Sequence, residues 1–255
     1  MSRSVGVVLP AYRPDVAQLG TYITDIQNAL TPETVVVELD APRDGVPEKL
    51  ASLPVDVDAV PYRRGKGAAI TAGFERLDTD VLAFADADGS TPVASLDEVL
   101  DPVRSGRADL AVGSRRHPDA EVASHQTFAR RFLGDGFAWL AGQLLDASLY
   151  DYQCGAKAID ATAWERVRDH LYEPGFAWDV ELIAIAAALD QRIDEIPIEW
   201  EDQPGSTVSP LRTSLDLFQA LLTARHRSKQ LRDDSFHTAL AEHLDEPTAL
   251  VEKDR

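Results

Sequence analysis

The chain of 255 residues is poor in cysteine, methionine and long apolar runs. Its single cysteine, Cys154, cannot form an intramolecular disulfide. The longest uninterrupted apolar run, from Leu182 to Leu189, is far shorter than the roughly 20 residues that a helix needs to cross a bilayer. The apolar stretch that ends at Pro10 is also too short for the core of a secretory signal. We therefore expect a protein that works in the cytosol.

Positive charge is scarce as well, because 25 lysines and arginines stand against 43 aspartates and glutamates, with a formal net charge of −18. Generic binding of nucleic acid needs clusters of positive charge, so the composition argues against this function. Only 5 of the cations are lysines. Since carboxylates occur in nearly every segment, the composition indicates a salt-loving, haloarchaeal type of host in which salt screens their repulsion. The alternative is an ordinary acidic protein with an acidic, disordered tail over residues 233–255.

Short apolar segments alternate with segments of helical periodicity in the first half of the chain. Apolar positions from Val16 to Leu30 recur at the spacing of one helix face, and Thr91-Pro92 offers a capping residue followed by proline at the first helical position. This alternation predicts an α/β fold with a mainly parallel central sheet flanked by helices. The expected strands are 5–9, 35–39, 55–60, 81–85 and 110–113, and the expected helices are 16–30, 67–77 and 92–104.

The second half is less regular, and it predicts helices over 128–146, 179–189 and 211–232 with a strand over 193–198. No segment has the character of a linker between independent domains. We therefore predict a single domain over residues 1–232, in which the later segments complete one cleft, followed by the acidic tail at 233–255.

The sharpest chemical signal is Asp86-Ala87-Asp88-Gly89, which directly follows an expected buried strand. In open parallel sheets, ligands bind beyond the carboxyl ends of the strands. Two carboxylates that are one residue apart on a turn can face one divalent cation, and Mg²⁺ typically takes one or two carboxylates together with substrate phosphates. The pattern predicts a site for a metal and a diphosphate, with a solvated acidic turn as the alternative.

A basic, glycine-rich stretch, Arg63-Arg64-Gly65-Lys66-Gly67, opens another expected helix. The amino end of a helix favours anions, so we predict that this stretch contacts phosphate or nucleotide. Its spacing differs from that of a Walker loop, in which Ser or Thr follows Gly-Lys. A mobile surface loop is the alternative.

Taken in order, these segments resemble glycosyltransferase family 2, and within it the dolichyl-phosphate sugar transferases of the glucosyl and mannosyl types. The resemblance covers about residues 4–215, and seven ordered motifs are far more specific than any one of them. The motifs are Val8-Leu9-Pro10-Ala11-Tyr12, Gly65-Lys66-Gly67-Ala68-Ala69 with Ala72-Gly73-Phe74, Asp86-Ala87-Asp88-Gly89-Ser90-Thr91, Val112-Gly113-Ser114-Arg115, Gln153-Cys154-Gly155-Ala156-Lys157, Trp178-Asp179-Val180-Glu181-Leu182, and Ile196-Pro197-Ile198-Glu199-Trp200 with Gly205-Ser206.

The resemblance implies a GT-A type fold, a UDP- or GDP-sugar donor, and Mg²⁺ or Mn²⁺ held by Asp86 and Asp88. It also implies that Asp88 and Arg115 help to neutralise the diphosphate, and that Asp179 stands near the reacting centre. The remaining residues that it places at the donor are Pro10, Ala11, Tyr12, Lys66, Gly67, Ala87 and Lys157.

The family's sugar transfer with inversion requires the charge of the leaving diphosphate to be neutralised. An alcohol acceptor would need a base such as Asp179, whereas a phosphate acceptor is largely ionised at neutral pH and would need Asp179 only for orientation. The mixture of basic and aromatic side chains over 128–145 suits a helix at a membrane surface, and a core helix with two surface arginines is the alternative. We therefore expect a lipid (dolichyl or polyprenyl) phosphate or a lipid-linked glycan as acceptor, contacted by Arg131 and Gln153, and an enzyme that lies peripherally on the cytoplasmic face of the membrane.

Two segments depart from the family pattern. Glu38-Leu39-Asp40-Ala41-Pro42 stands where relatives usually carry a Val-Asp-Asp-Gly-Ser sequence, so Asp40 is our predicted contact to the base or ribose. Gly205-Ser206-Thr207 stands in place of a Gly-Ser-Lys sequence, so one cation expected at the acceptor phosphate is missing. Two other functions stay open: a soluble nucleotide-sugar enzyme with a small acceptor, or a nucleotidyltransferase; and an inactive relative that binds a nucleotide-sugar.

Overall fold

The structure is a computed structural model that describes residues 3–123, 128–201, 210–232, 234, 237 and 247–253. In helices α5 (Phe128–Leu144) and α8 (Pro210–Leu231) the described side chains begin at Asp135 and Leu217. We predicted that Arg131 contacts the acceptor and that the Gly205-Ser206-Thr207 segment lacks a cation at the acceptor phosphate. The side chain of Arg131 and this segment both lie outside the described part of the chain.

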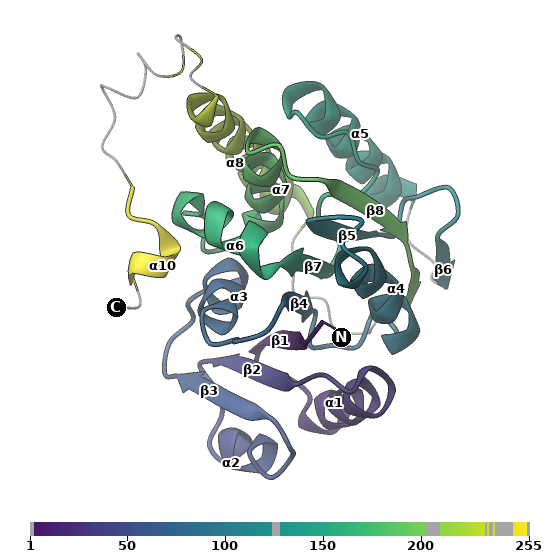
Figure 1. Ribbon diagram of the computed structural model, residues 1–255, viewed down its shortest axis with the longest axis vertical. Coiled ribbons are helices and arrows are strands. Elements are labelled where there is room, and N and C mark those ends of the chain that lie inside the picture. Colours follow the sequence, from purple (N-terminus) through teal and green to yellow (C-terminus); the bar gives the residue numbers. More distant parts are fainter. Residues whose placement is uncertain are drawn as a thin grey trace.

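A seven-stranded sheet forms the centre of the molecule (Figure 1). Its strands are parallel except for one, which is inserted antiparallel between two others because the chain returns across the sheet there. The α/β prediction with a mainly parallel sheet is confirmed. In spatial order the strands are β3 (Asp56–Val60), β2 (Thr34–Asp40), β1 (Val5–Tyr12), β4 (Val81–Ala85), the antiparallel β7 (Ala156–Asp160), β5 (Leu110–Ser114) and β8 (Ile193–Pro197).

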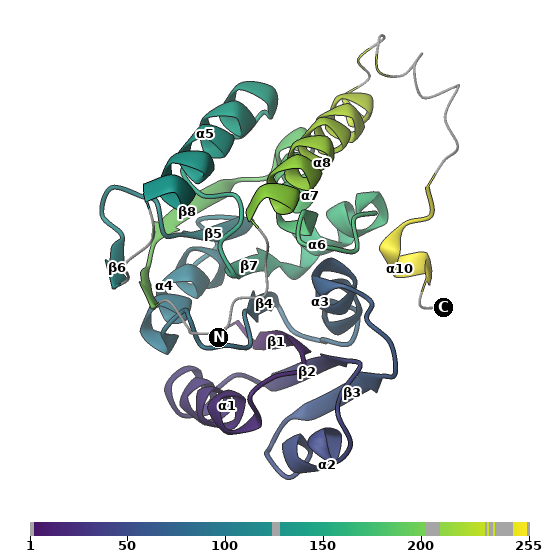
Figure 2. The same cartoon turned by 180° about the vertical axis from the view of Figure 1, so that it is seen from behind.

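Helices cover both faces of this sheet, since alternate side chains of its buried strands point to opposite sides. Val7 and Leu9 of β1 pack in one apolar cluster, whereas the intervening Val8 packs in the other. On the first face lie α1 (Val16–Leu30), α2 (Val46–Leu50) and α4 (Val93–Arg104). On the second lie α3 (Lys66–Phe74), α6 (Ala161–Val167), the short η1 (Arg168–His170) and α7 (Trp178–Ala188), with α5 and α8 packed beyond them (Figures 1 and 2).

Two predicted details are wrong, and in each case the reason is a contact between residues that lie far apart in the sequence. No strand is predicted over 156–160, yet this short segment, which contains Lys157, pairs with both β4 and β5. The predicted cap by Thr91 is also wrong, because Pro92 is the N-cap of α4 and the helix starts at Val93. The backbone oxygen of Thr91 instead accepts a hydrogen bond from the buried Tyr22 hydroxyl.

Two small elements complete the described fold. β6 (Glu121–Ala123) pairs with β9 (Glu199–Glu201) at the margin of the molecule. Within the segment expected to be a disordered tail, α10 (Leu250–Lys253) packs on α3 and η1, with Leu250 and Val251 buried. Residues 247–253 are thus a packed segment and not a free tail. The boundary of the domain at residue 232 stays a prediction.

None of the helices in the described ranges is both long enough and apolar enough to cross a bilayer.

Candidate active site

The carboxyl ends of β1, β2 and β4 meet at one edge of the sheet, which is where open α/β sheets bind their ligands. Tyr12 at the end of β1 pairs in register with Asp40 at the end of β2. Its ring is 41% exposed, and the Arg63 guanidinium carbon lies 4.4 Å from the ring centroid. The edge therefore presents an aromatic ring and a guanidinium group side by side.

Asp86 follows β4 at this edge, and a glycine makes room for its carboxylate. A Cβ atom on Gly155 would lie 2.0 Å from Asp86 Oδ2, so no larger residue at 155 is compatible with this position of the carboxylate. The backbone oxygen of Gly155 also accepts a hydrogen bond from the Asp86 N–H. Lys66 Nζ lies 3.0 Å from Asp86 Oδ1. The glycine and the lysine together fix where the negative charge sits.

Asp88 occupies the turn after β4 and is exposed. Its Oδ1 accepts a hydrogen bond from the Ser90 N–H, which fixes the side chain on the turn. Burial raises the pKa of the neighbouring Tyr22 phenol, and the charges of Asp86 and Asp88 raise it further. The charges of both carboxylates are therefore close enough to the Tyr22 hydroxyl to affect its pKa.

A chain of alternating charges leads from Asp86 into the protein. Lys66 Nζ lies 3.3 Å from Asp179 Oδ2, while Lys157 Nζ donates at 2.6 Å to Asp179 Oδ1. Asp179 and Lys157 are both almost completely buried. Burial alone would lower the pKa of Lys66, but the carboxylates of Asp179 and Asp86 outweigh this and raise it. Lys66 therefore stays a cation at the rim of the site.

Arg115 is held by a second buried carboxylate. Its guanidinium donates to both oxygens of Asp151, at 2.7 and 3.0 Å, and to the backbone oxygen of Gln153 at 3.1 Å. Burial would raise the pKa of Asp151, but the charge of Arg115 outweighs it and lowers the pKa. The pair fixes the chain just before Gly155.

The loop that carries Lys66 is anchored on β2 by Asp40. Asp40 Oδ2 accepts from the backbone N–H groups of Arg64 and Gly65 at 2.7 and 3.0 Å, and Oδ1 accepts from Arg64 Nε at 2.8 Å. Gly65 adopts a φ of 106°, and a Cβ atom there would meet the Pro174 oxygen at 2.3 Å. The loop is thereby clamped between β2 and the segment that precedes α7.

A model of the sequence family described as glycosyl transferase family 2 matches residues 6–146. The chain belongs to glycosyl transferase family 2. It is 31% identical over 228 residues to "Glycosyltransferase AglD" of Haloferax volcanii. This alignment covers 86% of the chain but only 36% of the Haloferax protein. It is 32% identical over 185 residues to the dolichyl-phosphate beta-glucosyltransferase of Mus musculus, covering 71% of this chain and 57% of the mouse enzyme. The chain is therefore shorter than both relatives.

Among solved structures, the fold is similar to that of glucosyl-3-phosphoglycerate synthase from Mycobacterium tuberculosis, described in complex with Mn²⁺, UDP and glucosyl-3-phosphoglycerate. The TM-score is 0.64 at 16% identity, over 87% of this chain and 80% of the mycobacterial chain. The predicted GT-A type fold is confirmed.

Most of the residues predicted for the donor lie together at the edge of the sheet in this glycosyl transferase. Tyr12, Lys66, Asp86 and Asp88 surround the carboxyl ends of β1 and β4, and Pro10, Ala11, Gly67 and Ala87 lie beside them in the chain. Lys157 and Arg115, which we predicted to contact phosphates, are each paired with a buried carboxylate, Asp179 and Asp151 respectively. Asp40, predicted to contact base or ribose, holds the 64–65 backbone. All of these roles in ligand binding stay predictions.

Three important residues were not singled out from the sequence. Asp151 orients Arg115, Gly155 leaves space for Asp86, and Glu38 lies buried next to Arg64. Gly155 belongs to one of the seven motifs, but the sequence does not indicate that it lies against the carboxylate of Asp86. Asp151 carried no signal, and Glu38 was visible only as the first residue of the segment that departs from the family pattern, since nothing in the sequence shows which cation either residue meets.

The donor set fits a divalent cation that is shared with a substrate. Asp86 and Asp88 supply hard carboxylate oxygens at an accessible turn, and the bare Cα of Gly155 leaves room for the Asp86 carboxylate. Within the ranges that the structure covers, no group of three histidine, cysteine or acidic side chains forms an all-protein metal site. The residues therefore suit Mg²⁺ or Mn²⁺ whose other ligands come from a diphosphate and water.

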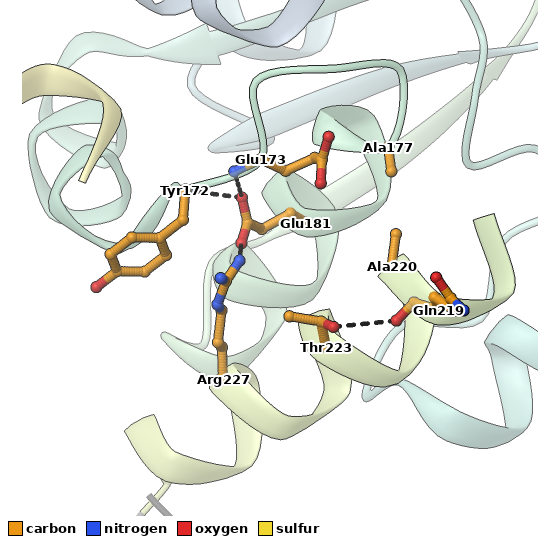
Figure 3. A pocket seen from close by; sticks show the side chains of 8 residues that line it. All are labelled: Tyr172, Glu173, Ala177, Glu181, Gln219, Ala220, Thr223 and Arg227. Carbon is orange, nitrogen blue, oxygen red and sulfur yellow. Dashed lines mark hydrogen bonds and ion pairs between the residues drawn. The ribbon is translucent and has the colours of Figure 1, made fainter. Parts of the chain in front are cut away.

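A separate cavity of about 330 Å³ is lined by the segment before α7, by the first turn of α7 and by α8 (Figure 3). Ala177 and Glu181 line it from one face of the helix, whereas Asp179 points from the opposite face to the two lysines. Glu181 accepts from the backbone N–H groups of Tyr172 and Glu173 and pairs with Arg227 of α8. This cluster fastens the segment before α7 to α8 and lies outside the charge chain of the active site.

Asp151→Asn should destabilise the protein by about 2–3 kcal/mol, because it leaves the guanidinium of Arg115 without its charge partner in a mostly buried place. Urea denaturation in constant salt measures this difference. Asp101→Asn is the matched control, since Asp101 and its partner Arg107 are both exposed and this change should leave the midpoint unaltered. Equal midpoints for both variants would show that the Arg115–Asp151 pair contributes no stability.

Proposed function

We propose that this enzyme transfers a sugar, with inversion, from a nucleotide-diphosphate donor to a polyprenyl (dolichyl) phosphate in a reaction that depends on Mg²⁺ or Mn²⁺. The observation that carries the proposal is the position of Asp86 just after β4, where its Oδ1 lies 3.0 Å from Lys66 Nζ, with the exposed Asp88 two residues further along the same turn. The names of relatives agree with it: one is a dolichyl-phosphate beta-glucosyltransferase and another binds Mn²⁺ and UDP.

The donor's charge explains why these residues are needed together. A protein with a net charge of −18 repels a diphosphate unless positive charge is placed at the site. Asp86 and Asp88 would hold the cation, which when bound would stabilise the negative charge of the leaving diphosphate. Lys66 offers a second positive charge at the same rim, and Tyr12 with Arg63 offers a surface for the nucleoside.

The transfer step needs little proton chemistry from the protein. The acceptor phosphate oxygen forms a bond to the anomeric carbon while the bond from that carbon to the donor diphosphate breaks, and the diphosphate leaves with the electron pair. The acceptor is already largely ionised near neutral pH. Asp179 Oδ1 accepts a hydrogen bond from Lys157 Nζ, and Asp179 Oδ2 lies 3.3 Å from Lys66 Nζ. These ion pairs argue that Asp179 positions the two lysines and does not remove a proton.

Exposed apolar side chains on neighbouring helices support a lipid acceptor. Phe218 and Leu222 lie one turn apart on α8 and are 43% and 44% exposed, and Trp139 of the adjacent α5 is 69% exposed. Large exposed apolar side chains on two helices that contact each other support contact with a lipid or another apolar partner. We propose that α5 and α8 rest on the cytoplasmic surface of a membrane, which brings the lipid phosphate to the enzyme.

Trp139→Ala combined with Leu222→Ala should lower transfer to dolichyl phosphate in vesicles about tenfold, while affinity for the donor stays unchanged. The reason is that each change removes apolar area that would enter the lipid surface, at about 25 cal/mol per Å². Vesicle sedimentation measures binding to the membrane, and product formation measures the rate of transfer to the lipid. A double variant, Thr24→Ala with Asp25→Ala on the exposed face of α1, is the control for surface change.

The function is tested by assaying UDP-glucose and GDP-mannose with and without Mn²⁺, in high KCl, against dolichyl phosphate and 3-phosphoglycerate. Metal-dependent glycosylation of the lipid supports the proposal. Transfer to 3-phosphoglycerate alone would overturn the lipid acceptor and favour a small soluble acceptor. Binding of a donor without transfer to either acceptor or hydrolysis would favour an inactive nucleotide-sugar-binding relative.

A further inference from the structure

Glu38 is an acidic side chain inside the sheet with no hydrogen bond to either carboxyl oxygen from the described residues. It is fully buried in the middle of β2, where it pairs in register with Pro10 of β1 and Asp58 of β3. Gly73 of α3 leaves the space that it fills, because a Cβ atom there would lie 3.1 Å from Glu38 Cγ. A buried carboxyl in this situation strongly favours its neutral form unless a cation compensates it.

The surrounding charges do not fully compensate Glu38. Arg64 Nη2 lies 2.8 Å from Glu38 Oε2, but the same guanidinium also donates to Asp40 and lies 3.7 Å from Asp58. Arg76, which follows α3, lies 3.4 Å from Asp58. Three carboxylates thus share two guanidinium groups, so the cluster carries one excess negative charge when all five groups are ionised.

The proton affinity of Glu38 reflects this imbalance. Burial raises the pKa of Glu38 to about 7, against the opposing charge of Arg64 and with a further raising effect from Asp58. The group therefore exchanges its proton in the range where the enzyme would work.

The cluster adjoins the loop that carries Lys66 of the proposed donor site. Glu38 is two residues before the end of β2, and Arg64, which it contacts, is two residues before Lys66. Lys66 in turn contacts Asp86 and Asp179. A negative diphosphate at the edge of the sheet therefore acts electrostatically on Glu38, and Glu38 acts on the loop that carries Lys66.

We propose that Glu38 is a proton-linked positioning residue of the donor site, which takes up a proton when the nucleotide diphosphate binds. The inference rests on the proposed nucleotide-sugar donor and adds a pH control that the residues contacting the donor do not supply. The neutral form of Glu38 removes the excess negative charge of the cluster, so that the donor meets less repulsion and Arg64 remains held by Asp40.

The sign of the pH effect follows from linkage. Relative to the protein that already holds Mn²⁺, a bound diphosphate adds negative charge at the edge of the sheet and raises the cost of charge at Glu38. The donor-bound state therefore holds more protons than the Mn²⁺-loaded state without donor near neutral pH. Donor affinity must then fall as the pH rises through neutrality, by up to about tenfold for each unit by which binding raises the pKa of Glu38. Below pH 6 the group is protonated in both states and affinity should level off.

The test is calorimetric titration of UDP-glucose into the full chain saturated with Mn²⁺, between pH 6 and 8.5, in buffers of different ionisation enthalpy. The diphosphate of UDP-glucose does not titrate in this range, so proton uptake reports on the protein. We expect proton uptake near pH 7 and affinity several-fold weaker at pH 8.5 than at pH 6. Glu38→Gln should bind with no pH dependence in this range, whereas the exposed Glu48→Gln should behave like the natural protein.

Asp58→Asn gives a second, independent readout, because it removes the neighbouring charge that favours the protonated form of Glu38. It should move the midpoint of proton uptake to lower pH. If UDP-glucose binds but no proton is taken up, or if Glu38→Gln keeps the pH dependence, the role of Glu38 is overturned while the donor proposal stands. If neither UDP-glucose nor GDP-mannose binds at any pH, the proposed function itself is overturned.

Discussion

Gly155→Ala should lower the rate of sugar transfer about 100-fold while the protein still folds. The added methyl group would lie 2.0 Å from Asp86 Oδ2, and the atoms that it would meet most closely all belong to the Asp86 carboxyl group. Because that side chain is partly exposed, it can move away without unfolding the sheet, but it then no longer holds its place beside Lys66. A displacement of about 1 Å at a reacting group costs on the order of 100-fold in rate.

The measurement is kcat with saturating donor and Mn²⁺, together with circular dichroism to verify the fold. Gly136→Ala is the matched control, because among the described residues nothing beyond its chain neighbours and the nearby backbone of α5 lies within 4 Å of the Cβ that it would add. Its rate should equal that of the natural protein. Full activity of Gly155→Ala would mean that the position of the Asp86 carboxylate is unimportant.

Asp88→Asn should lower kcat by about 100- to 1,000-fold, since it removes one of two charged ligands of the cation that offsets the leaving diphosphate. The fold should be unaffected, because Asp88 is exposed and asparagine keeps an oxygen that can accept the Ser90 N–H. Stability should therefore match that of the natural protein in urea denaturation.

Asp25→Asn on the exposed face of α1 removes the same charge far from β4 and serves as the control. Assays over a range of Mn²⁺ concentrations should show that Asp88→Asn needs more metal for half-maximal rate. A variant that retains the natural rate and the natural metal requirement would argue against Asp88 as a ligand.

The sheet edge could be predicted because its strands carry their own signal. β1, β2 and β4 are short runs of Val, Leu and Ala that are buried on both faces, and α1 shows one apolar face. β7 could not be predicted in this way, because Ala156–Asp160 has a lysine at its second position and an aspartate at its end, and it is held as a strand by two neighbours. Its antiparallel insertion is a property of the tertiary fold and has no local pattern.

For the site, residue types and their order in the chain indicated which groups would gather, but not how they would pair. Asp86 and Lys66 lie in contact at the end of β4, and Asp88 follows on the same turn, while their roles in binding stay predictions. Lys157 was expected at the phosphates, yet it is buried against Asp179, which is 22 positions away in the sequence. Likewise, Arg115 is engaged by Asp151. Partners this distant become visible only when the chain is folded.

The most direct test is a calorimetric titration of UDP-glucose into the natural protein with Mn²⁺ and again after chelation of all divalent ions. A cation shared by Asp86, Asp88 and the diphosphate predicts at least about 100-fold tighter binding with Mn²⁺, and loss of this gain in Asp86→Asn. Equal affinity with and without Mn²⁺, in the natural protein and in Asp86→Asn alike, would contradict the account.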